Sequence, residues 1–488
     1  MSDRLAAGVP RTAAILSVVL LLSSAGFAQI TRADSVRILG AQFLIPSEAT
    51  LLDEATLTPP EDAISVSLDQ SVRMALAQSP SVRRANLQAA IAASNVTLGN
   101  AGFLPSASAG LTLSGSDTQG LTGGGEPSAD RRSINSLQAD ISAGWTIYDG
   151  LRRNSTLRRL RAEADRATLD ADADAEDTAF FVAAAYLDLV RLERVTIALA
   201  EAAAISRERL QLAQARADIG VGANIDAALA LADLNADRAA LLRQQIAVSN
   251  ARARLGQLIG LPEPDRIATV DALTLPEPLD TQRIAEIAEA RNRRLQAFRA
   301  GEQAAAAAAG EVRADFRPQV RFQTGIGGAL FGGGILPFPD VPIGPDFRYG
   351  ITASLPLFDG FERQRRLRNA EFAIAIADEN TRSERLALRT ALAQLQITYA
   401  RSLELVALET QNLEVVRRNV QVALSQFELG FISAIDLRQI QLALVTAEVS
   451  LAQTIFQTRL AATELRLLAG ELLPPDAALV PPVSVDVP

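Results

Sequence analysis

The chain has no histidine, no cysteine and no lysine among its 488 residues. Without cysteine it forms neither disulfides nor thiolate metal sites, and without histidine it lacks the commonest general base and metal ligand. We therefore expect no catalytic residue, no cofactor and no metal site, and we predict that the protein is not an enzyme. The formal net charge of -9 also argues against nucleic-acid binding, because phosphate contacts require a basic surface.

Aromatic residues make up only 5% of the chain although 48% of it is hydrophobic, so the core is expected to consist of aliphatic contacts. Abundant alanine and leucine favour long helices. Beyond residue 28, no stretch approaches the roughly 18 uncharged apolar residues that a membrane-spanning helix needs. If the mature chain crosses a membrane, it must do so as strands.

The N-terminus, over positions 1–28, has the three parts of a secretory signal peptide. Arg4 and Arg11 form the charged region, residues 13–22 form the apolar region, and Gly26-Phe27-Ala28 is a small-x-small cleavage site. The apolar region is too short to anchor the chain in about 30 Å of hydrocarbon. We therefore predict export from the cytoplasm and cleavage after Ala28.

The second half of the chain repeats the first at an offset of 210 positions. This offset relates Tyr148-Asp149-Gly150 to Phe358-Asp359-Gly360, Gly220 to Gly430, and Ile225-Asp226 to Ile435-Asp436. Solenoid repeats have periods of about 20 to 50 residues, so an offset this long indicates a duplicated domain instead.

Each repeat contains one predicted β-hairpin. Residues 106–114 and 137–145 alternate between apolar and small or polar side chains, as do the segments around Val320 and Tyr349. Glycine-rich loops, at 120–125 and 325–344, join the strands of each pair. Such alternation also fits a half-buried soluble sheet.

Three features favour a membrane sheet over a soluble one. The strands approach the length of a tilted membrane strand, and their polar faces carry very small residues. Aromatic residues also gather at the strand ends away from the loops, as at a membrane interface: Phe103, Trp145, Tyr148, Phe316 and Phe358. Four strands cannot close a membrane barrel, which needs at least about 8, so a barrel would be shared between chains.

The longest predicted helices follow the hairpins. Residues 151–219 and 361–429 contain no glycine or proline, which gives two uninterrupted runs of equal length. Each would be roughly 100 Å long and stable only when packed along its length. Both end at a glycine, Gly220 or Gly430, after which a returning helix is expected. An acidic run at 170–177 lies within the first long helix, and we expect a solvated or lumen-facing patch there.

The predicted domain organisation follows from these elements. Its parts are a signal peptide (1–28), an N-terminal extension (29–63), repeat 1 (64–260; first helix 68–101, β-hairpin about 105–147, helical hairpin 151–259), a linker (261–280), repeat 2 (281–470; first helix 281–313, β-hairpin about 318–357, helical hairpin 361–469) and a proline-rich tail (471–488).

This order of elements, with the Phe/Tyr-Asp-Gly junctions and the two Gly-x-x-x-x-Ile-Asp turns, resembles the TolC family of outer-membrane factors over residues 64–470. The resemblance implies an α+β membrane protein: a homotrimer in which four strands per chain form one transmembrane β-barrel, continued by a periplasmic coiled-coil tunnel. It implies a passive exit channel for a tripartite efflux pump or a type I secretion system in the outer membrane of a Gram-negative bacterium. Its partners would be a periplasmic adaptor protein, an inner-membrane transporter and outer-membrane lipid.

The resemblance also assigns roles to residues near the helical turns. It places adaptor docking at the tips Gly220, Gly222 and Gly430, and the periplasmic gate at Asp226, Asp436, Gln439, Phe427 and Ile432. Phe427 and Ile432 are apolar where the best-known members carry polar gate-locking residues. Asp226 and Asp436 also fit simple helix capping, which is compatible with a role in gating.

Two other functions remain open at the level of sequence. One is a secreted or periplasmic coiled-coil scaffold with soluble hairpins and no channel activity. The other is a general diffusion porin, which four strands and long helices fit poorly. Within the channel class, the sequence does not separate drug efflux from protein secretion.

Overall fold

The structure is a computed structural model that describes residues 63–121, 127–220, 224–332 and 346–473. The predicted signal peptide, nearly all of the N-terminal extension and most of the C-terminal tail lie outside these ranges, as do parts of both glycine-rich loops. Among the described residues, no helix is long and apolar enough to cross a membrane.

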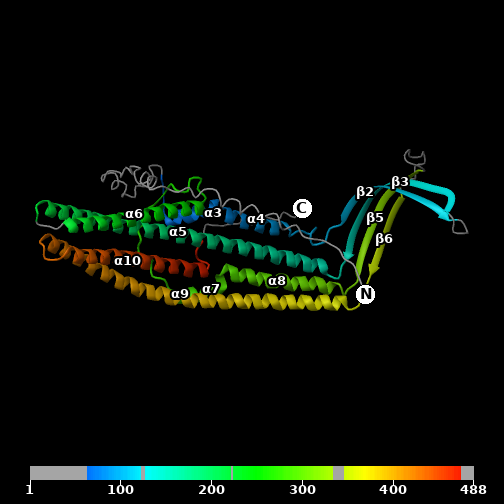
Figure 1. Cartoon of the computed structure of the whole chain (residues 1–488). Coiled ribbons are helices and arrows are strands. Elements are labelled where there is room, and N and C mark those ends of the chain that lie inside the picture. The colour runs from blue at the N-terminus through cyan, green and yellow to red at the C-terminus, as the bar shows by residue number, and fades with distance from the viewer. Residues whose placement is uncertain (1–62, 122–126, 221–223, 333–345, 474–488) are drawn as a thin grey trace, which may run out of the picture. The chain divides into compact units, whose positions relative to one another are not determined.

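Four antiparallel strands form one sheet in the order β2-β3-β5-β6 (Figure 1). Strands β2 (Ser106–Leu121) and β3 (Pro127–Tyr148) form the hairpin of repeat 1, and β5 (Gln319–Gly332) and β6 (Asp346–Ser354) form that of repeat 2. The hairpins join where β3 pairs with β5. One predicted hairpin per repeat is therefore confirmed.

The strands of repeat 1 are longer than predicted. β2 has 16 residues and β3 has 22, because the pairing continues without a break from Ser114↔Ser136 to Gln119↔Arg131. That stretch is rich in serine and charged residues and lacks apolar alternation, so periodicity did not reveal it.

Two helices of equal length follow the hairpins, as predicted. α5 (Arg152–Asp218) and α9 (Glu362–Glu428) each have 67 residues and contain no glycine or proline. The returning helices are α6 (Asn224–Ile259) and α10 (Ala434–Leu468). The predicted fold class, long paired helices with a four-stranded sheet, is thus confirmed.

The first helix of each repeat is broken, whereas we expected each to be continuous. In repeat 1, α3 (Leu68–Gln78) gives way to α4 (Pro80–Ser94), because Pro80 has no N–H to donate and is accepted only in the first turn of a helix. In repeat 2, α7 (Thr281–Arg291) gives way to α8 (Arg293–Ala314) at Asn292, whose side chain accepts a hydrogen bond from Leu295 N at 2.9 Å. Each break therefore begins a new helix, with proline in its first turn in repeat 1 and an asparagine cap in repeat 2.

A short parallel ladder, which the sequence analysis missed, joins β1 (Ile64–Val66) to β4 (Ile267–Thr269). The buried Tyr186 hydroxyl lies 3.1 Å from Val66 O and 2.8 Å from Asp271 Oδ2, which ties the ladder to α5. The ladder connects the start of repeat 1 to the segment between the repeats, so the predicted linker contains ordered structure.

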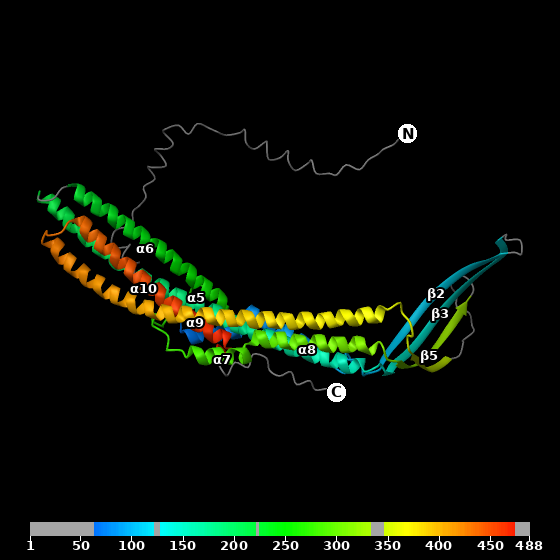
Figure 2. The same ribbon diagram turned by 90° about the horizontal axis from the view of Figure 1, so that it is seen from below.

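The longer helices form a layer whose order can be followed along its length, and the short helices α3 and α7 pack against it. Next to the sheet the order is α4-α5-α8-α9, and farther from the sheet it is α6-α5-α10-α9 (Figures 1 and 2). One edge of the layer always belongs to repeat 1 and the other to α9. In the sheet, likewise, the edge strand β2 belongs to repeat 1 and the edge strand β6 belongs to repeat 2.

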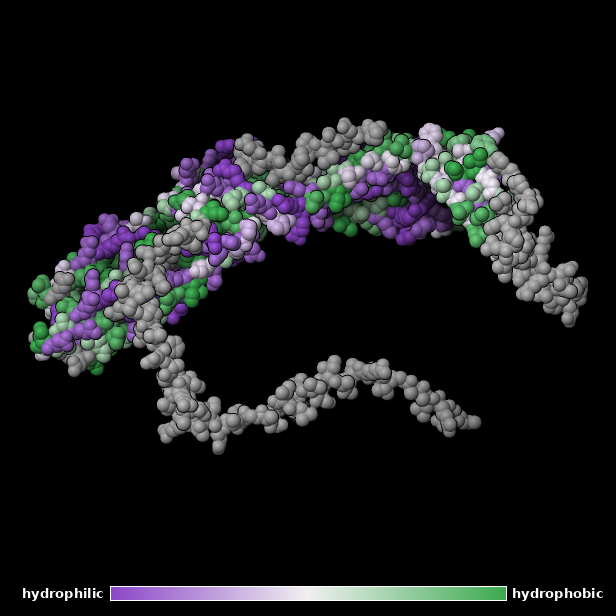
Figure 3. Space-filling model, turned by 90° about the horizontal axis from the view of Figure 1, so that it is seen from above, coloured by the Kyte–Doolittle hydropathy of each residue, from purple (hydrophilic) through white to green (hydrophobic). Residues whose placement is uncertain are grey.

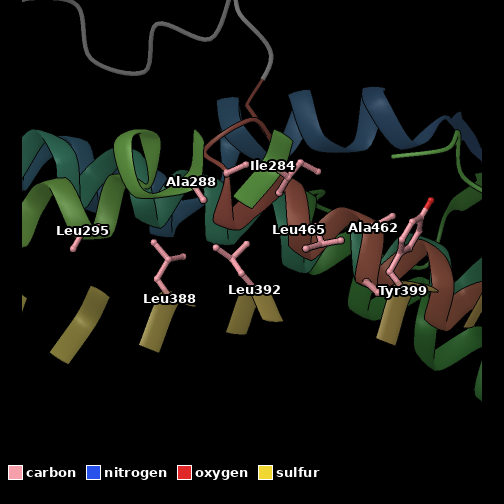
Figure 4. Packing of buried hydrophobic residues seen from close by; sticks show 10 residues of the cluster. Ile284, Ala288, Leu295, Leu388, Leu392, Tyr399, Ala462 and Leu465 are labelled. Atoms are coloured by element: carbon pink, nitrogen blue, oxygen red, sulfur yellow. The ribbon is translucent and has the colours of Figure 1, made fainter. Parts of the chain in front are cut away.

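One apolar core cluster lies where α7, the start of α8, α9 and α10 meet (Figure 4). α7 contributes Ile284, α9 contributes Leu388, Leu392 and Tyr399, and α10 contributes Leu465. Alanines such as Ala288, Ala461 and Ala462 fill the remaining contacts, so the helices approach closely. This agrees with the expectation of a core built from aliphatic contacts.

Candidate functional site

The sheet has two chemically different faces. On one face, large apolar side chains are exposed; Tyr349, for example, retains 77% of its surface. The same face carries Leu111, Leu113, Ile141, Ile326 and Ile351. Exposed apolar area of this extent indicates a surface that contacts lipid or another protein. Hydrophobic and near-neutral residues cover the sheet in Figure 3, whereas hydrophilic residues are frequent along the helices.

The opposite face of the sheet is polar and lined by small residues. Cross-strand rows place Ser108 beside Ser142, with 3.0 Å between their hydroxyl oxygens, and Ser142 beside Gly325. A hollow of about 720 Å³ runs along this region, and its lining includes Gln138, Asp140 and Arg348. This face is suited to contact water and polar solutes.

The five aromatic residues singled out in the sequence all lie at the end of the sheet that joins the helices. Phe103 precedes β2, Trp145 and Tyr148 end β3, Phe316 precedes β5 and Phe358 follows β6. Trp145 Nε1 donates a hydrogen bond to Phe103 O at 3.0 Å. Phe358 is the most exposed and makes an edge-on contact with Phe361. The structure therefore brings these residues to one level of the molecule.

The junction between each hairpin and its long helix has an unusual backbone. Gly150 and Leu151 are both left-handed, with φ of 71° and 72°, and Gly360 and Phe361 repeat this with 66° each. Only glycine adopts this conformation without strain. The Asp149 carboxylate accepts a hydrogen bond from Arg153 N at 2.8 Å, so it caps the first turn of α5. Asp359 does the same for Arg363 N at 3.1 Å.

The helical tips have open space around their glycines. Gly220 (φ 75°) and Gly430 (φ 79°) end α5 and α9 in the left-handed conformation, and a Cβ built on either would meet nothing within 4 Å. Gly222, the third predicted tip residue, lies outside the described residues. The space at both described glycines leaves the tips accessible from outside the chain.

Asp436 belongs to a capping box at the start of α10. Ser433 is the N-cap, its hydroxyl accepts from Asp436 N at 3.2 Å, and the Asp436 carboxylate accepts from Ser433 N at 3.1 Å. Hydrogen bonds from the Ser433 side chain and backbone hold the pKa of Asp436 below its usual value. Asp436 is therefore the third residue of the helix and not the cap itself. Asp226 and Gln439 are exposed, and Asp226 lies in the first turn of α6.

Phe427 and Ile432 pack into a small apolar cluster next to the tip of α9. Phe427 is buried against Ala423 and Leu437, with Ile432 partly buried beside them. The Arg216 guanidinium of α5 lies over the Phe427 ring at 5.3 Å and donates a hydrogen bond to Phe427 O at 3.1 Å. This places a cation–π contact between the two repeats at the tip, beside the apolar side chains that stand where the best-known family members carry polar residues.

A buried charged cluster near the tips was missed by the sequence analysis. The Arg438 guanidinium of α10 donates two hydrogen bonds to the Asp237 carboxylate of α6, at 2.6 and 2.8 Å, and its Nε lies 3.8 Å from Asp233 Oδ1. Ser206 and Arg209 of α5 bond to Asp237 and Asp233, respectively. We call the residues Ser206, Arg209, Asp233, Asp237, Arg438 and Gln441 the three-helix cluster.

The cluster ties α10 to the helical hairpin of repeat 1. Gln441 Nε2 donates to Ala202 O at 2.8 Å, and Ser206, Arg209 and Gln441 are all buried. One signal in the sequence could have revealed it. At an offset of 210, Arg438 corresponds to Ala228, and Asp237 and Asp233 correspond to Ala447 and Ala443. The charged residues of the cluster therefore occur in only one of the two repeats at each position, so the cluster is a difference between the repeats.

The acidic run within α5 is not wholly solvated, contrary to our expectation. Glu176 keeps only 3% of its surface, and burial raises its pKa to about 7. It lines a hollow of about 350 Å³ together with Arg293 and Arg294 of α8 and Glu384 of α9. Arg294 pairs with Asp177 at 2.7 Å, so the acidic run contacts the arginines that begin α8. The run is partly an inter-helix contact.

Comparison with known proteins adds a family match to this geometry. The model of a family described as outer membrane efflux protein matches residues 72–261 and 284–471, which covers both repeats. The chain is 26% identical over 344 residues to Protein CyaE of Bordetella pertussis, which covers 69% of this chain and 70% of that protein.

Solved structures show a similar fold. The outer membrane protein VceC of Vibrio cholerae aligns with a TM-score of 0.65 and 20% identity, over 83% of this chain and 96% of that one. The Campylobacter jejuni CmeC outer membrane channel aligns with a TM-score of 0.69 and 16% identity, over 83% of this chain and 85% of that one.

Proposed function

Because the chain belongs to the outer membrane efflux protein family, we propose that three copies assemble into one continuous exit channel. The protein is an outer-membrane channel that gives exported substrates a passive path out of the cell, with its helical part in the periplasm. The observation that carries the assembly is the pair of open edges that runs the whole length of the layer. The scaffold alternative is not favoured, because it leaves the family match without explanation.

Open edges at matching positions support closure into a ring. In the sheet the free edges are β2 and β6, and in the helical layer they are α4 or α6 on one side and α9 on the other. A chain with two different free edges closes by head-to-tail contacts, in which the repeat 1 edge of one copy meets the repeat 2 edge of the next. Three chains would supply twelve strands to one barrel, which leaves no edge strand unpaired.

α9 carries an apolar stripe suited to this contact. Leu386, Ile397 and Leu408 follow one another about three helical turns apart, and Leu408, Val415, Val422 and Leu429 about two turns apart, so all six lie on one helix face. All six are exposed, and Leu429 keeps 71% of its surface. Helices of this length need packing along their course. The stripe supplies a seam for a neighbouring copy.

The opposite edge carries matching apolar residues. Leu87 and Ile91 are exposed on α4 one turn apart, and Leu231, Leu242 and Ile246 are exposed on α6. Both edges therefore expose aliphatic side chains at the level of α4 and at the level of α6. Burial of these two edges against each other would remove most of this apolar surface from water.

The gate is proposed to lie at the helical tips. Asp226 and Asp436 are exposed in the first turns of α6 and α10, and Gln439 is exposed one turn farther along α10. All three can face the entrance, and Phe427 and Ile432 pack beneath them. The three-helix cluster holds the returning helix of repeat 2 against the hairpin of repeat 1 close to this entrance. Separation of the two hairpins would leave buried charges without partners, so the cluster favours the packed state.

The accessible tip glycines are proposed to receive a periplasmic adaptor protein, which would connect the channel to an inner-membrane transporter. Gly220 and Gly430 leave space for an incoming helix, and Gly222 belongs to the same turn in the sequence. The aromatic level formed by Phe103, Trp145, Tyr148, Phe316 and Phe358 is proposed to lie at the periplasmic interface of the membrane.

Reconstitution tests this function directly. Purified protein in planar bilayers should give stepwise ion conductance, and its mass in detergent should be three times the 51.8 kDa of the chain, less the cleaved signal peptide. If the protein is a monomer in detergent and produces no conductance in bilayers, both the assembly and the channel are refuted. Gly430→Trp adds bulk at a tip and should abolish export while the trimer and its conductance remain. The control variant is Leu355→Trp, which adds the same side chain at an exposed position just after β6, away from the tips.

A further inference from the structure

The polar face of the sheet carries a single carboxylate near the middle of its central strands. Asp140 lies in β3, where it pairs with Gly110 of β2 and with Gly327 of β5. Its row in the sheet continues from Gly327 to Asp346 of β6. An ionisable side chain at the depth of a membrane sheet is costly, and such residues commonly mark the path of a solute or ion.

The strands beside Asp140 are built to leave its carboxylate free. A Cβ on Gly110 would lie 2.8 Å from Asp140 Oδ1, and a Cβ on Gly327 would lie 3.3 Å from Asp140 Cβ. Glycine on both sides therefore gives the carboxylate room that any other residue would restrict. The space in front of it is the hollow of about 720 Å³ on the polar face.

Within the described part of the sheet, Asp140 has no hydrogen-bond or ion-pair partner, in contrast to the charges on β6. There Arg348 Nε lies 3.0 Å from Asp346 Oδ2, so these two charges largely cancel. Arg321 of β5 is also on the polar face, but it pairs in register with Thr146, near the helical end of the sheet. Six residues of strand, roughly 20 Å, separate its level from that of Gly327.

We propose that Asp140 sets the charge preference of the strand region, where it attracts cations and cationic groups of a solute and repels anions. The proposal rests on the shared barrel described above, in which symmetry repeats the carboxylate in each chain around one level of the lumen. Arg321 forms a separate cationic level, because about 20 Å exceeds the Debye length of about 10 Å at 0.1 M salt. Asp140 therefore acts on a permeating ion independently of Arg321.

A test follows from the absence of cysteine in the chain, since Asp140→Cys introduces the only thiol. Single channels are measured in bilayers at 0.1 M KCl before and after reaction with a thiosulfonate that carries either a sulfonate or a trimethylammonium group. We expect Asp140→Asn and unreacted Asp140→Cys to lower the cation-to-anion permeability ratio by roughly two- to fivefold. The sulfonate should restore the ratio, and the trimethylammonium group should lower it further.

Two controls separate this proposal from its alternatives. Ile141→Cys places a thiol on the apolar face of the same strand, where both reagents should leave conductance and selectivity unchanged. At 1 M KCl the effect of the Asp140 substitutions should nearly vanish, since the Debye length falls to about 3 Å.

The outcomes distinguish the inference from the function on which it rests. Absence of any conductance in the unsubstituted protein would overturn the channel itself. Normal conductance with the same permeability ratio in Asp140→Asn, and no response of Asp140→Cys to either reagent, would overturn only the role of Asp140. Modification of Ile141→Cys in place of Asp140→Cys would show that the other face lines the lumen, which also overturns it.

Discussion

Replacement of Arg438 by methionine should lower the free energy of local opening at the start of α10. The expected effect is larger than for an ordinary substitution near the end of a long helix. Methionine keeps the apolar stem but removes the two hydrogen bonds to Asp237, at 2.6 and 2.8 Å, and the contact with Asp233. The side chains of Arg438 and Asp237 are only 18% and 12% exposed. Removal of one partner from a buried ion pair typically costs about 3–5 kcal/mol.

The expected cost here is smaller because partners remain. Ser206 still donates to Asp237 at 2.5 Å, and Arg209 still bonds to Asp233. Asp233 is also one-third exposed, so water can solvate it. We therefore expect the local opening free energy of this region to fall by about 2–3 kcal/mol.

Hydrogen exchange measures this local opening. Amides in the second and third turns of α10 should exchange roughly 30- to 150-fold faster in Arg438→Met, since each 1.4 kcal/mol corresponds to about a tenfold change. Arg418→Met is the matched control, because Arg418 pairs with Glu414 at 3.5 Å on an exposed surface and contributes little. This control should leave exchange in α10 unchanged.

A double variant decides whether the unpaired charge causes the effect. Asp237→Asn keeps an acceptor for Ser206 but removes the charge, so Asp237→Asn combined with Arg438→Met should recover at least half of the loss. If the single and double variants exchange equally fast, or if Arg418→Met behaves like Arg438→Met, the cluster does not hold α10 as described.

Three further predictions concern other parts of the chain. Burial raises the pKa of Glu176 from 4.5 to about 7, so the folded state loses up to about 3 kcal/mol of stability as the pH rises from 4.5 through 7. Glu176→Gln should therefore raise the melting temperature at pH 8 but not at pH 4. Leu408→Arg should reduce the trimer fraction measured by light scattering in detergent, whereas Thr410→Arg, which lies off the stripe, should not. Gly150→Ala should lower the melting temperature more than Gly360→Ala. Both variants place alanine in the left-handed conformation, which costs about 1–2 kcal/mol. Only at position 150 would the new Cβ also meet a backbone oxygen, at 2.7 Å.

Patterns local in sequence predicted the main elements well. The two 67-residue helices follow from uninterrupted runs without glycine or proline, and the hairpins follow from alternation next to glycine-rich loops. The helix breaks were missed although Pro80 is visible in the sequence, because apolar spacing continues across it. The break at Asn292 has no proline and depends on a side-chain cap. The three-residue strands β1 and β4 are too short to show any period.

Contacts between distant segments were harder to predict than elements. The three-helix cluster joins residues from α5, α6 and α10 that lie up to 235 positions apart, as in the bond from Gln441 to Ser206. Each of its arginines and aspartates alone looks like an ordinary charge on a solvated helix face. The burial of Glu176 was missed for the same reason, since the arginines that line the hollow with it belong to α8.

The difference between the two repeats at Arg438 has a consequence for what a duplicated chain can do. A ring made from six copies of a single repeat would have to carry each side chain six times, at every hairpin. With two fused repeats, alternate hairpins are free to differ, so Arg438 stands where the first repeat has Ala228, and Asp237 where the second has Ala447. Duplication therefore allows neighbouring helical hairpins to have different roles, which strict sixfold symmetry forbids. The hairpin of repeat 1 supplies the aspartates, and the hairpin of repeat 2 is bound to it through Arg438.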